Sequence, residues 1–355
     1  MADRAAVPVQ PALRRPVGTC GDPPRASLGP VAPRRPRAFA LSDCNWIGRA
    51  RALGNRGCGV TTIRSSSHRI GGQVARAGQL RDRLSDGSCL IVPDAHDVMT
   101  AQLVEAADFP AVYVGSFGAS ASRWGVPDQS LVSLPQILES VAAIADHVDI
   151  PVVVDLEDGG PNALSVHHNV RAAERAGSAA IQIEDQRPGK MLGTGEELYP
   201  IEVAVERIRA AVEARTSPDT IIIGRSEALN VGGTLDETVD RCAAYAGAGA
   251  DLVTPSMVPL EQITEVAARI GADATTWGFG THGSEELNVE GHAMAIYAVQ
   301  STVVSYQAAR DFLNRLATTG ESLPQDEFMG LVGELLALQG GPANQQIAAR
   351  FSTEP

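Results

Sequence analysis

Lysine, aromatic residues and cysteine are all scarce in this chain of 355 residues. Lys190 is the single lysine among 29 basic residues. Aromatic side chains make up only 4%, which argues against a stacking surface for single-stranded nucleic acid. The five cysteines form no C-x-x-C pair, so zinc sites and thioredoxin-type chemistry lack support. Such a sparse, odd set is typical of a reducing compartment, and we expect a cytoplasmic protein.

Long apolar segments are absent as well. No uninterrupted apolar run reaches the roughly 18–20 residues that a membrane span needs, and no apolar region near the first residue resembles a secretory signal. The glycine-rich phosphate fingerprint of dinucleotide-binding folds is also missing. We therefore expect no membrane partner and no dinucleotide-binding domain of that type.

The charges divide the chain near residue 80. Residues 1–79 carry 13 Arg and 3 Asp, a net charge of +10, whereas residues 80–355 carry 16 basic and 39 acidic side chains, a net charge of −23. The first part has no lasting helical or strand period, which predicts a disordered basic extension. Such a segment is typical of an arm that binds an anionic partner, or of a transit peptide. It also arises when the start of translation is placed too far upstream. We favour the last interpretation and expect no nucleic-acid partner.

From residue 88 onward, short β-rich runs alternate with Ala-rich amphipathic stretches. Buried runs of four or five apolar residues between helices are what a parallel sheet covered on both faces requires. Eight such units in about 220 residues predict an α/β protein with a (β/α)₈ TIM barrel rather than an open sheet. We assign residues 80–320 to this barrel and residues 321–355 to a C-terminal helix and tail. The expected strands are Cys89–Val92, Ala111–Gly115, Pro151–Asp155, Ala179–Glu184, Thr220–Arg225, Asp251–Thr254, Thr275–Phe279 and Ala295–Val299.

Acidic side chains stand at the ends of several expected strands, where a (β/α)₈ barrel places its active site. Asp155 directly ends the third strand and Glu184 the fourth. Carboxylates crowded in a low-dielectric pocket repel one another, and a divalent cation with oxygen ligands, Mg²⁺ or Mn²⁺, resolves that conflict. The alternative is that the acids cap the following helices or pair with cations. That alternative stays open for Asp158, Asp185 and Glu227.

The same rim offers groups that suit an anionic substrate. Arg225 ends the fifth strand, and its planar guanidinium suits bidentate binding of a carboxylate. An internal salt bridge to Glu227 or Glu184 is the alternative for Arg225. The backbone N–H groups of Gly115–Ser120 suit a carboxylate, a phosphonate or a developing oxyanion.

Two further side chains are candidates for proton transfer. Lys190 lies in a glycine-rich loop after the fourth strand, and such loops often close over a substrate and exclude water. An ordinary solvated loop lysine is the alternative. His96 follows the first strand on the active rim.

In order and spacing, several motifs resemble the isocitrate lyase/phosphoenolpyruvate mutase superfamily between about Leu80 and Thr318. These motifs are Pro93–Asp97, Gly115-Ser116 followed by Gly125–Asp128, Val152–Gly159, Ile183–Gln186 and Ile222–Arg225. The resemblance implies a (β/α)₈ barrel whose C-terminal helix is exchanged between the subunits of a homodimer or homotetramer. It also implies a Mg²⁺ cofactor, with Mn²⁺ as a substitute, and a small 2-oxoacid or related dicarboxylate or phosphonate substrate.

The resemblance also implies roles for individual residues. Asp155 is the expected direct Mg²⁺ ligand, and Glu157 and Glu184 are expected to bind the ion through water. Together with the rim analysis, it makes Lys190, Arg225 and His96 the catalytic candidates. The expected substrate-binding residues are Ser116, Phe117, Gly118, Asp128 and Arg225.

The chain departs from the superfamily motifs at four places. Glu157 replaces the second acid of the usual Asp-x-Asp, and Gly189–Gly193 lacks the Cys and His of the lyase motif Lys-Lys-Cys-Gly-His. Leu192 stands where the mutase branch has Asn, and Thr254–Ser256 lacks the acid of several lyases.

Three functions therefore stay open. The first is a Mg²⁺-dependent lyase that cleaves or decarboxylates the C–C bond next to an enolpyruvate-like group in a 2-oxo- or 2-hydroxy-dicarboxylate. The second is a phosphonomutase or phosphonopyruvate hydrolase that acts on a P–C bond. The third is a barrel that binds a metabolite without catalysis.

Overall fold

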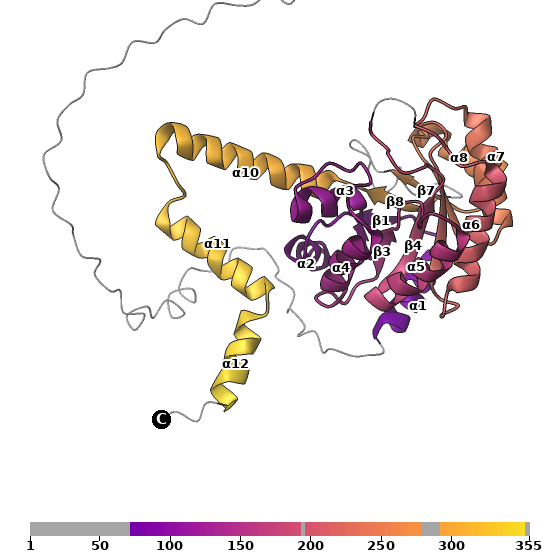
Figure 1. Cartoon of the computed structure of the whole chain (residues 1–355). Helices are drawn as coiled ribbons and strands as arrows, with labels where there is room; N and C mark the ends of the chain where they lie inside the picture. Colours follow the sequence, from indigo (N-terminus) through magenta and orange to yellow (C-terminus); the bar gives the residue numbers. More distant parts are fainter. Residues whose placement is uncertain (1–71, 193–195, 278–291, 352–355) are drawn as a thin grey trace, which may run out of the picture. The chain divides into compact units, whose positions relative to one another are not determined.

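The computed structural model describes residues 72–192, 196–277 and 292–351 (Figure 1). Residues 1–71, which hold most of the expected basic extension, lie outside the described residues. The same is true of the last two residues of the expected seventh strand, at positions 278 and 279. Within the described ranges, no helix combines the length and the apolar character that crossing a membrane requires.

Eight parallel strands form one sheet in the described residues, and the sheet curls into a nearly closed barrel. The sheet order is β1-β8-β7-β6-β5-β4-β3-β2, and a parallel bridge between Asp94 and Tyr113 connects its two outer strands. This confirms the predicted (β/α)₈ barrel, and every strand lies within three residues of its expected bounds. The strands are β1 (Leu90–Pro93), β2 (Val112–Val114), β3 (Val152–Asp155), β4 (Ser178–Glu184), β5 (Ile221–Ser226), β6 (Leu252–Pro255), β7 (Ala274–Trp277) and β8 (His292–Tyr297).

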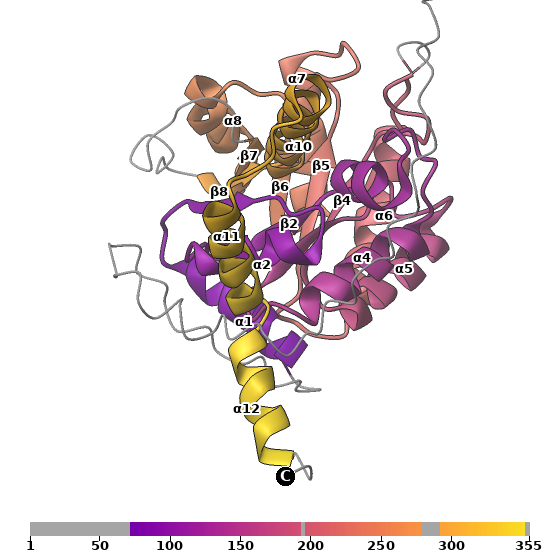
Figure 2. The ribbon, with the colours of Figure 1, turned by 90° about the vertical axis from the view of Figure 1, so that its left-hand side faces the viewer.

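Helices surround the strands, as Figure 2 shows for α4 to α8. Helix α1 precedes the first strand, and α10, α11 and α12 follow the last. In the segment expected as a C-terminal helix and tail, the chain forms the two helices α11 and α12, which are separated by the left-handed Gly340, and Pro342 suits the first turn of the second. The helices are α1 (Gly72–Ser85), α2 (Val98–Ala106), α3 (Ser116–Ala119), η2 (Ser120–Trp124), α4 (Leu134–Ala145), α5 (Ala163–Ala176), α6 (Ile201–Ala214), α7 (Leu235–Gly247), η3 (Leu260–Gln262), α8 (Ile263–Ile270), α10 (Gln300–Thr319), α11 (Gln325–Leu338) and α12 (Gly341–Phe351).

The alternation of side chains along the strands determines which residues reach the barrel mouth. In β3, Val152 and Val154 pack in the outer core between sheet and helices, whereas Val153 packs in the inner core of the barrel. Successive side chains of a strand point to opposite faces, so Asp155, two residues after Val153, shares the inner face. The same alternation in β5 brings Arg225 to the inner face.

Helix α1 packs against the inner core. Its residues Ala77 and Leu80 are buried in the same cluster as Leu90 and Leu252, which begin two of the strands. Arg81 of α1 also forms a 2.9 Å ion pair with Asp251. Helix α1 therefore belongs to the barrel and crosses position 80, where the charge of the chain changes.

Replacing Leu80 by alanine is expected to lower the free energy of unfolding by about 2–5 kcal/mol, because a fully buried leucine leaves a cavity behind. The exposed Gln79 on the same helix offers a matched control, and its replacement by alanine should change stability by less than about 0.5 kcal/mol. Chemical denaturation followed by circular dichroism measures both. Equal stability of the two variants would contradict the packing of α1 against the inner core.

Candidate active site

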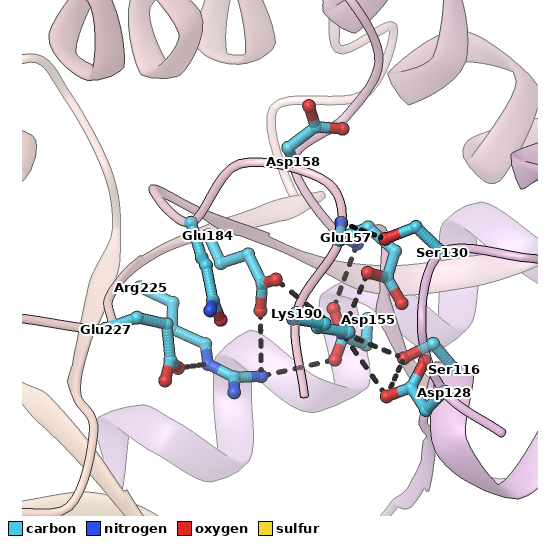
Figure 3. Close-up of polar contacts among 12 residues, drawn as sticks. Ser116, Asp128, Ser130, Asp155, Glu157, Asp158, Glu184, Lys190, Arg225 and Glu227 are labelled. Carbon is cyan, nitrogen blue, oxygen red and sulfur yellow. Dashed lines mark hydrogen bonds and ion pairs between the residues drawn. The ribbon is translucent and has the colours of Figure 1, made fainter. Parts of the chain in front are cut away.

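Three neighbouring strands deliver the charged residues of the site. Asp155 ends β3, Glu184 ends β4, and Arg225 is the last residue but one of β5. Glu184 and Arg225 are direct neighbours in the register of β4 and β5. The carboxyl ends of parallel strands meet at one end of a barrel, so these side chains converge as the sequence predicted (Figure 3).

Lys190 lies at the centre of the cluster, as Figure 3 shows. Its Nζ lies 2.7 Å from Glu157 Oε2, 3.4 Å from Asp128 Oδ2 and 3.6 Å from Glu184 Oε1. It also donates a 3.4 Å hydrogen bond to Ser116 Oγ. Lys190 is only 7% exposed, so it is not an ordinary solvated loop lysine in this structure.

Two long-range hydrogen bonds hold the loop that carries Lys190. The Gly189 N–H donates to Ser130 Oγ at 3.1 Å, and Gln129 Nε2 donates to the Met191 carbonyl at 3.2 Å. Both partners come from the segment that joins β2 to α4. Residues on either side of Lys190 are thus attached to a different part of the barrel rim.

Arg225 pairs with three carboxylates. Its Nη1 lies 3.2 Å from Asp155 Oδ2 and 3.5 Å from Glu184 Oε2, and its Nε pairs with Glu227. Nε also donates to Ser256 Oγ at 3.1 Å. Arg225 thus forms the internal salt bridges to Glu227 and Glu184 that the sequence analysis gave as an alternative. These contacts hold the guanidinium at the barrel mouth.

Burial makes the carboxylates of the cluster hard to ionise. It raises the pKa of Asp128 and Glu157 above their usual values and raises the pKa of Glu184 well above. The charge of Lys190 lowers all three pKa values in part, and the charge of Asp155 raises them again. Burial therefore favours the neutral form of these three acids, and the charge of Lys190 offsets only part of that effect.

The same charges act on Lys190 in the opposite direction. Burial alone would lower its pKa, but Glu184, Glu157, Asp155 and Asp128 together raise the pKa well above the usual value. Lys190 therefore keeps its proton at neutral pH, which suits an electrostatic partner for negative charge and not a base.

A short turn of helix follows β2 and borders the cluster. Gly115 precedes the four-residue helix α3, and Ser116 and Gly118 within it are buried. The first N–H groups of a helix have no intrahelical acceptor, so the N–H groups of Ser116, Phe117 and Gly118 are donors at this rim. Ser116 Oγ also donates to Asp128 Oδ2 at 3.3 Å, which joins the expected substrate-binding residues to the acid cluster.

His96 is not part of this contact network. Its ring contacts Thr100 Oγ1 at 3.4 Å, Ser301 Oγ at 3.5 Å and Asp97 Oδ2 at 3.7 Å. It also packs against Gly118, where an added Cβ would lie 3.1 Å from His96 Cβ. His96 thus lies behind the α3 turn, beside the start of α10, and its catalytic role stays a prediction.

Two other strand-end acids pair outside the cluster. Asp158 accepts hydrogen bonds from Tyr199 Oη and Arg207 Nη2, each at 2.8 Å, and Figure 3 shows it directed away from Lys190. Asp185 accepts from Tyr245 Oη at 2.5 Å and from the Glu227 N–H at 2.8 Å. These acids hold neighbouring loops in place, which agrees with the structural interpretation that had stayed open for them.

Sequence reasoning did not select two residues that touch the cluster. Tyr113 Oη donates to Asp155 Oδ2 at 3.1 Å, and Ser256 Oγ donates to Glu227 Oε1 at 2.6 Å. The alternation of side chains along the strands could have indicated both residues, since Tyr113 lies in β2 and Ser256 directly follows β6.

The donor chemistry of the cluster fits a hard divalent cation. The donors are carboxylate oxygens, which Mg²⁺ and Mn²⁺ prefer, and Glu184 Oε2 is buried without a hydrogen-bond partner in the described part of the chain. As arranged, no three Asp, Glu, His or Cys side chains among the described residues form a metal-binding group by themselves. Lys190 and Arg225 lie between the carboxylates. A metal ion therefore has to share the carboxylates with these two side chains or displace one of the two.

The fold and the site together define a (β/α)₈-barrel protein with a buried acid cluster at its catalytic mouth. The chain belongs to the phosphoenolpyruvate phosphomutase family, whose model matches residues 80–317. This places it in the isocitrate lyase/phosphoenolpyruvate mutase superfamily of enzymes, as the strand-end motifs predicted.

Comparison with individual proteins gives relatives of several activities. The 2,3-dimethylmalate lyase of Eubacterium barkeri is 31% identical over 285 residues, which are 78% of this chain and 98% of the relative. The solved phosphoenolpyruvate phosphomutase of Streptomyces platensis subsp. rosaceus has a TM-score of 0.70 and 30% identity, and the match covers 78% of this chain and 99% of that one. A phosphonopyruvate hydrolase solved with oxalate and Mg²⁺ has a TM-score of 0.70, 28% identity and the same coverage.

Proposed function

We propose that this protein is a Mg²⁺-dependent lyase that cleaves or decarboxylates the C–C bond next to an enolpyruvate-like group in a 2-oxo- or 2-hydroxy-dicarboxylate. The observation that carries the proposal is the gathering of Asp128, Asp155, Glu157 and Glu184 around Lys190, with Arg225 beside them. A substrate of this class is a small dianion with chelating oxygens, which a cation-binding acid cluster that also contains Lys190 and Arg225 can hold. The similarity to a 2,3-dimethylmalate lyase supports the C–C reaction.

Asp155, Glu157 and Glu184 are the residues that would hold Mg²⁺ or Mn²⁺. Mg²⁺ keeps several waters and takes one or two direct carboxylates. This suits Asp155 as the one direct ligand, with Glu157 and Glu184 bound to waters of the ion. When bound, the ion would supply Lewis-acid polarisation of the oxo group of the substrate. The oxalate and Mg²⁺ in the related phosphonopyruvate hydrolase support this assignment.

The protein's own groups would orient the substrate and handle protons. The N–H groups of Ser116, Phe117 and Gly118 would receive the carboxylate of the 2-oxoacid half, opposite the guanidinium of Arg225. Lys190, protonated and buried, would stabilise negative charge that develops on the substrate. Its exclusion from bulk water strengthens this effect. It would be a candidate proton donor only once a bound substrate or ion changes its surroundings.

A pyruvate-coupled screen tests the proposed function. The purified full chain with Mg²⁺ is given oxaloacetate, malates with a methyl group at carbon 2, and phosphonopyruvate, and both pyruvate and phosphate are measured. Release of pyruvate from a dicarboxylate, lost with a chelator and restored by Mg²⁺, is the expected result. Binding of oxalate and Mg²⁺ without turnover of any substrate would favour the non-catalytic barrel.

The second candidate function is P–C bond chemistry, as in a phosphonomutase or phosphonopyruvate hydrolase. The similarity to solved enzymes of both kinds favours it. The two functions share the 2-oxoacid half of the substrate and differ in the group that leaves. Turnover of phosphonopyruvate, to pyruvate and phosphate by a hydrolase or to phosphoenolpyruvate by a mutase, faster than pyruvate release from any dicarboxylate, would establish this candidate in place of the first.

We further propose that the chain forms a homodimer or homotetramer in which its C-terminal helices pack on a partner subunit. Helices α10, α11 and α12 bury no residue within the described part of the chain. Large exposed apolar patches mark interaction sites, and these helices expose many large apolar side chains. The exposed apolar side chains are Val303, Val304, Tyr306, Leu313, Leu316, Phe328, Leu331, Leu335, Leu336, Ile347 and Phe351.

Light scattering is expected to give the mass of two or four chains of 37.2 kDa. Replacing Leu331 and Leu335 by glutamate should shift the mass toward one chain, because charges would be buried unpaired at the contact. The control is Glu334→Gln on the same exposed helix. A single-chain mass for the unmodified protein would contradict the proposal.

A further inference from the structure

A cavity of about 360 Å³ adjoins the acid cluster. It lies between the loops that follow β2, β3 and β4, and two of the cluster acids, Glu157 and Glu184, form part of its wall. Its volume falls in the range of small-molecule sites, which begins near 300 Å³. The cavity is therefore large enough for a part of the substrate that extends beyond the chelating oxygens.

Apolar side chains form much of the remaining wall. They are Val132, Leu134, Pro135, Pro161 and Pro188. Three are prolines, whose rings are fixed and which have no N–H group to offer a ligand. Val132 and Leu134 also pack against the outer core, which holds their positions.

Outside the acid cluster, polar side chains of the wall already have partners within the protein. Ser133 Oγ donates to Gln136 Oε1 at 2.7 Å, and Asn169 Nδ2 donates to the Gly159 carbonyl at 2.9 Å. A group that enters the cavity meets few polar atoms that still need a hydrogen bond. This favours an apolar group, since a polar one would lose its bonds to water without full replacement.

The charges of the wall disfavour an anionic group. Among the described residues that line the cavity, none is Lys, Arg or His, whereas Glu157, Asp158 and Glu184 are acids. The charge of Asp158 is balanced by Arg207, which lies 2.8 Å away and does not line the cavity. A carboxylate here would find no cation in the wall and would face the acids of the cluster.

We propose that this cavity holds an uncharged, apolar substituent of the substrate, beside the bond that breaks. The inference rests on the proposed C–C lyase function and assigns its substrate class as alkyl-substituted malates or the corresponding 2-oxoacids. Substrates with a third carboxylate at that position are excluded. The acid cluster binds the oxygens common to all such substrates, and the cavity selects the substituent.

Malates substituted at carbon 2 or carbon 3 test the inference. In the preferred series, from hydrogen through methyl and ethyl to 2-methylpropyl, kcat/KM should rise by about fourfold for each methylene, the ratio that corresponds to about 0.8 kcal/mol per buried CH₂. The 2-methylpropyl group and the carboxymethyl group have the same shape but differ in charge. The carboxymethyl compound should react about 100-fold more slowly, because like charges brought together at a buried contact cost several kcal/mol.

A cavity-filling variant gives a second measurement. In Val132→Phe, the ratio of kcat/KM for the 2-methylpropyl malate to that for unsubstituted malate should fall by about tenfold. The control is Leu131→Phe at the neighbouring residue, which is 62% exposed and does not line the cavity. This control should leave the ratio unchanged.

Binding of oxalate with Mg²⁺, measured by calorimetry on the same protein, separates the two proposals. If oxalate binds but kcat/KM stays level or falls along the alkyl series, or the carboxymethyl compound is preferred, the inference is wrong and the lyase proposal stands. If oxalate does not bind with Mg²⁺, the proposed function fails and the substrate class fails with it.

Discussion

Replacing Asp155 by asparagine is expected to abolish the stabilisation of this protein by Mg²⁺ with oxalate, a mimic of enolpyruvate. Asparagine keeps the size of the side chain and an oxygen that can accept the 3.0 Å hydrogen bond from the Glu157 N–H. It loses the negative charge that a direct ligand of a divalent cation needs. Mutation of a residue that only supports a direct metal ligand typically lowers metal affinity or activity 10–100-fold. Because Asp155 is the expected direct ligand, we expect its replacement to lower the affinity for Mg²⁺ by at least about 100-fold.

Thermal unfolding with and without Mg²⁺ and oxalate measures this effect. The unmodified protein should unfold at a higher temperature when both are present, because ligands that bind the folded state stabilise it. Glu197→Gln is the matched control, since Glu197 is an exposed acid on the loop that carries Lys190. An Asp155→Asn variant that still gains the full stabilisation would remove Asp155 from the metal site.

Replacing Lys190 by methionine is expected to destabilise the protein at neutral pH, and Mg²⁺ should restore much of the loss. The variant removes the cation that contacts Asp128, Glu157 and Glu184. Among the described residues, only Glu184 of these three keeps an ion pair, with Arg225. Removal of one partner from a buried ion pair typically costs about 3–5 kcal/mol. In a domain of this size that corresponds to a Tm lower by about 10 °C.

The pH dependence of this variant follows from the direction of the pKa shifts. Burial raises the pKa values of Asp128, Glu157 and Glu184 above the usual 3.8 for Asp and 4.5 for Glu. The folded state therefore holds protons more tightly than the unfolded state, and the stability that this provides is lost as the pH rises through the raised values. Lys190 lowers all three pKa values, so its removal raises them and extends the loss to higher pH.

Between about pH 5 and about pH 8, the Tm of Lys190→Met should fall more steeply than that of the unmodified protein. Arg187→Met on the same loop is the matched control, because Arg187 is half-exposed and lies 3.9 Å from the exposed Glu197. The control should follow the unmodified protein. Parallel pH profiles of Lys190→Met and the unmodified protein would show that Lys190 does not neutralise the cluster.

The barrel could be predicted because its signals are local. Each strand is a short buried run such as Val152–Val154, and each following helix carries an apolar face. Helix α1 was missed because it lies in the Arg-rich segment. The contacts that hold α1 are distant in sequence, as between Arg81 and Asp251.

The strand-end acids were also predictable, because parallel strands end on the same side of a barrel. Which of two adjacent acids faces the cluster was not predictable from the local pattern, and only the family resemblance pointed to Glu157. Glu157 adopts a left-handed backbone with φ of 54° and contacts Lys190, whereas its neighbour Asp158 turns to Arg207. The sequence has no signal for this turn, since a non-glycine residue rarely adopts such a φ.

The position of Lys190 was beyond local reasoning for a similar reason. It lies six residues after the end of β4, and hydrogen bonds from its neighbours Gly189 and Met191 to Ser130 and Gln129 fix the path of the loop. These pairs are about 60 residues apart in the chain. The placement of His96 beside α10 likewise depends on Asp94, which accepts the Ser301 N–H at the start of that helix.

A crystal structure of this protein with Mn²⁺ and oxalate tests the metal assignment most directly. An anomalous peak about 2.1 Å from a carboxylate oxygen of Asp155, with Glu157 and Glu184 facing the ion, is the expected result. Oxalate should then lie between the α3 turn and Arg225. A peak bound elsewhere, or no peak while Asp155 keeps its contacts to Tyr113 and Arg225, would contradict a cation at this barrel mouth.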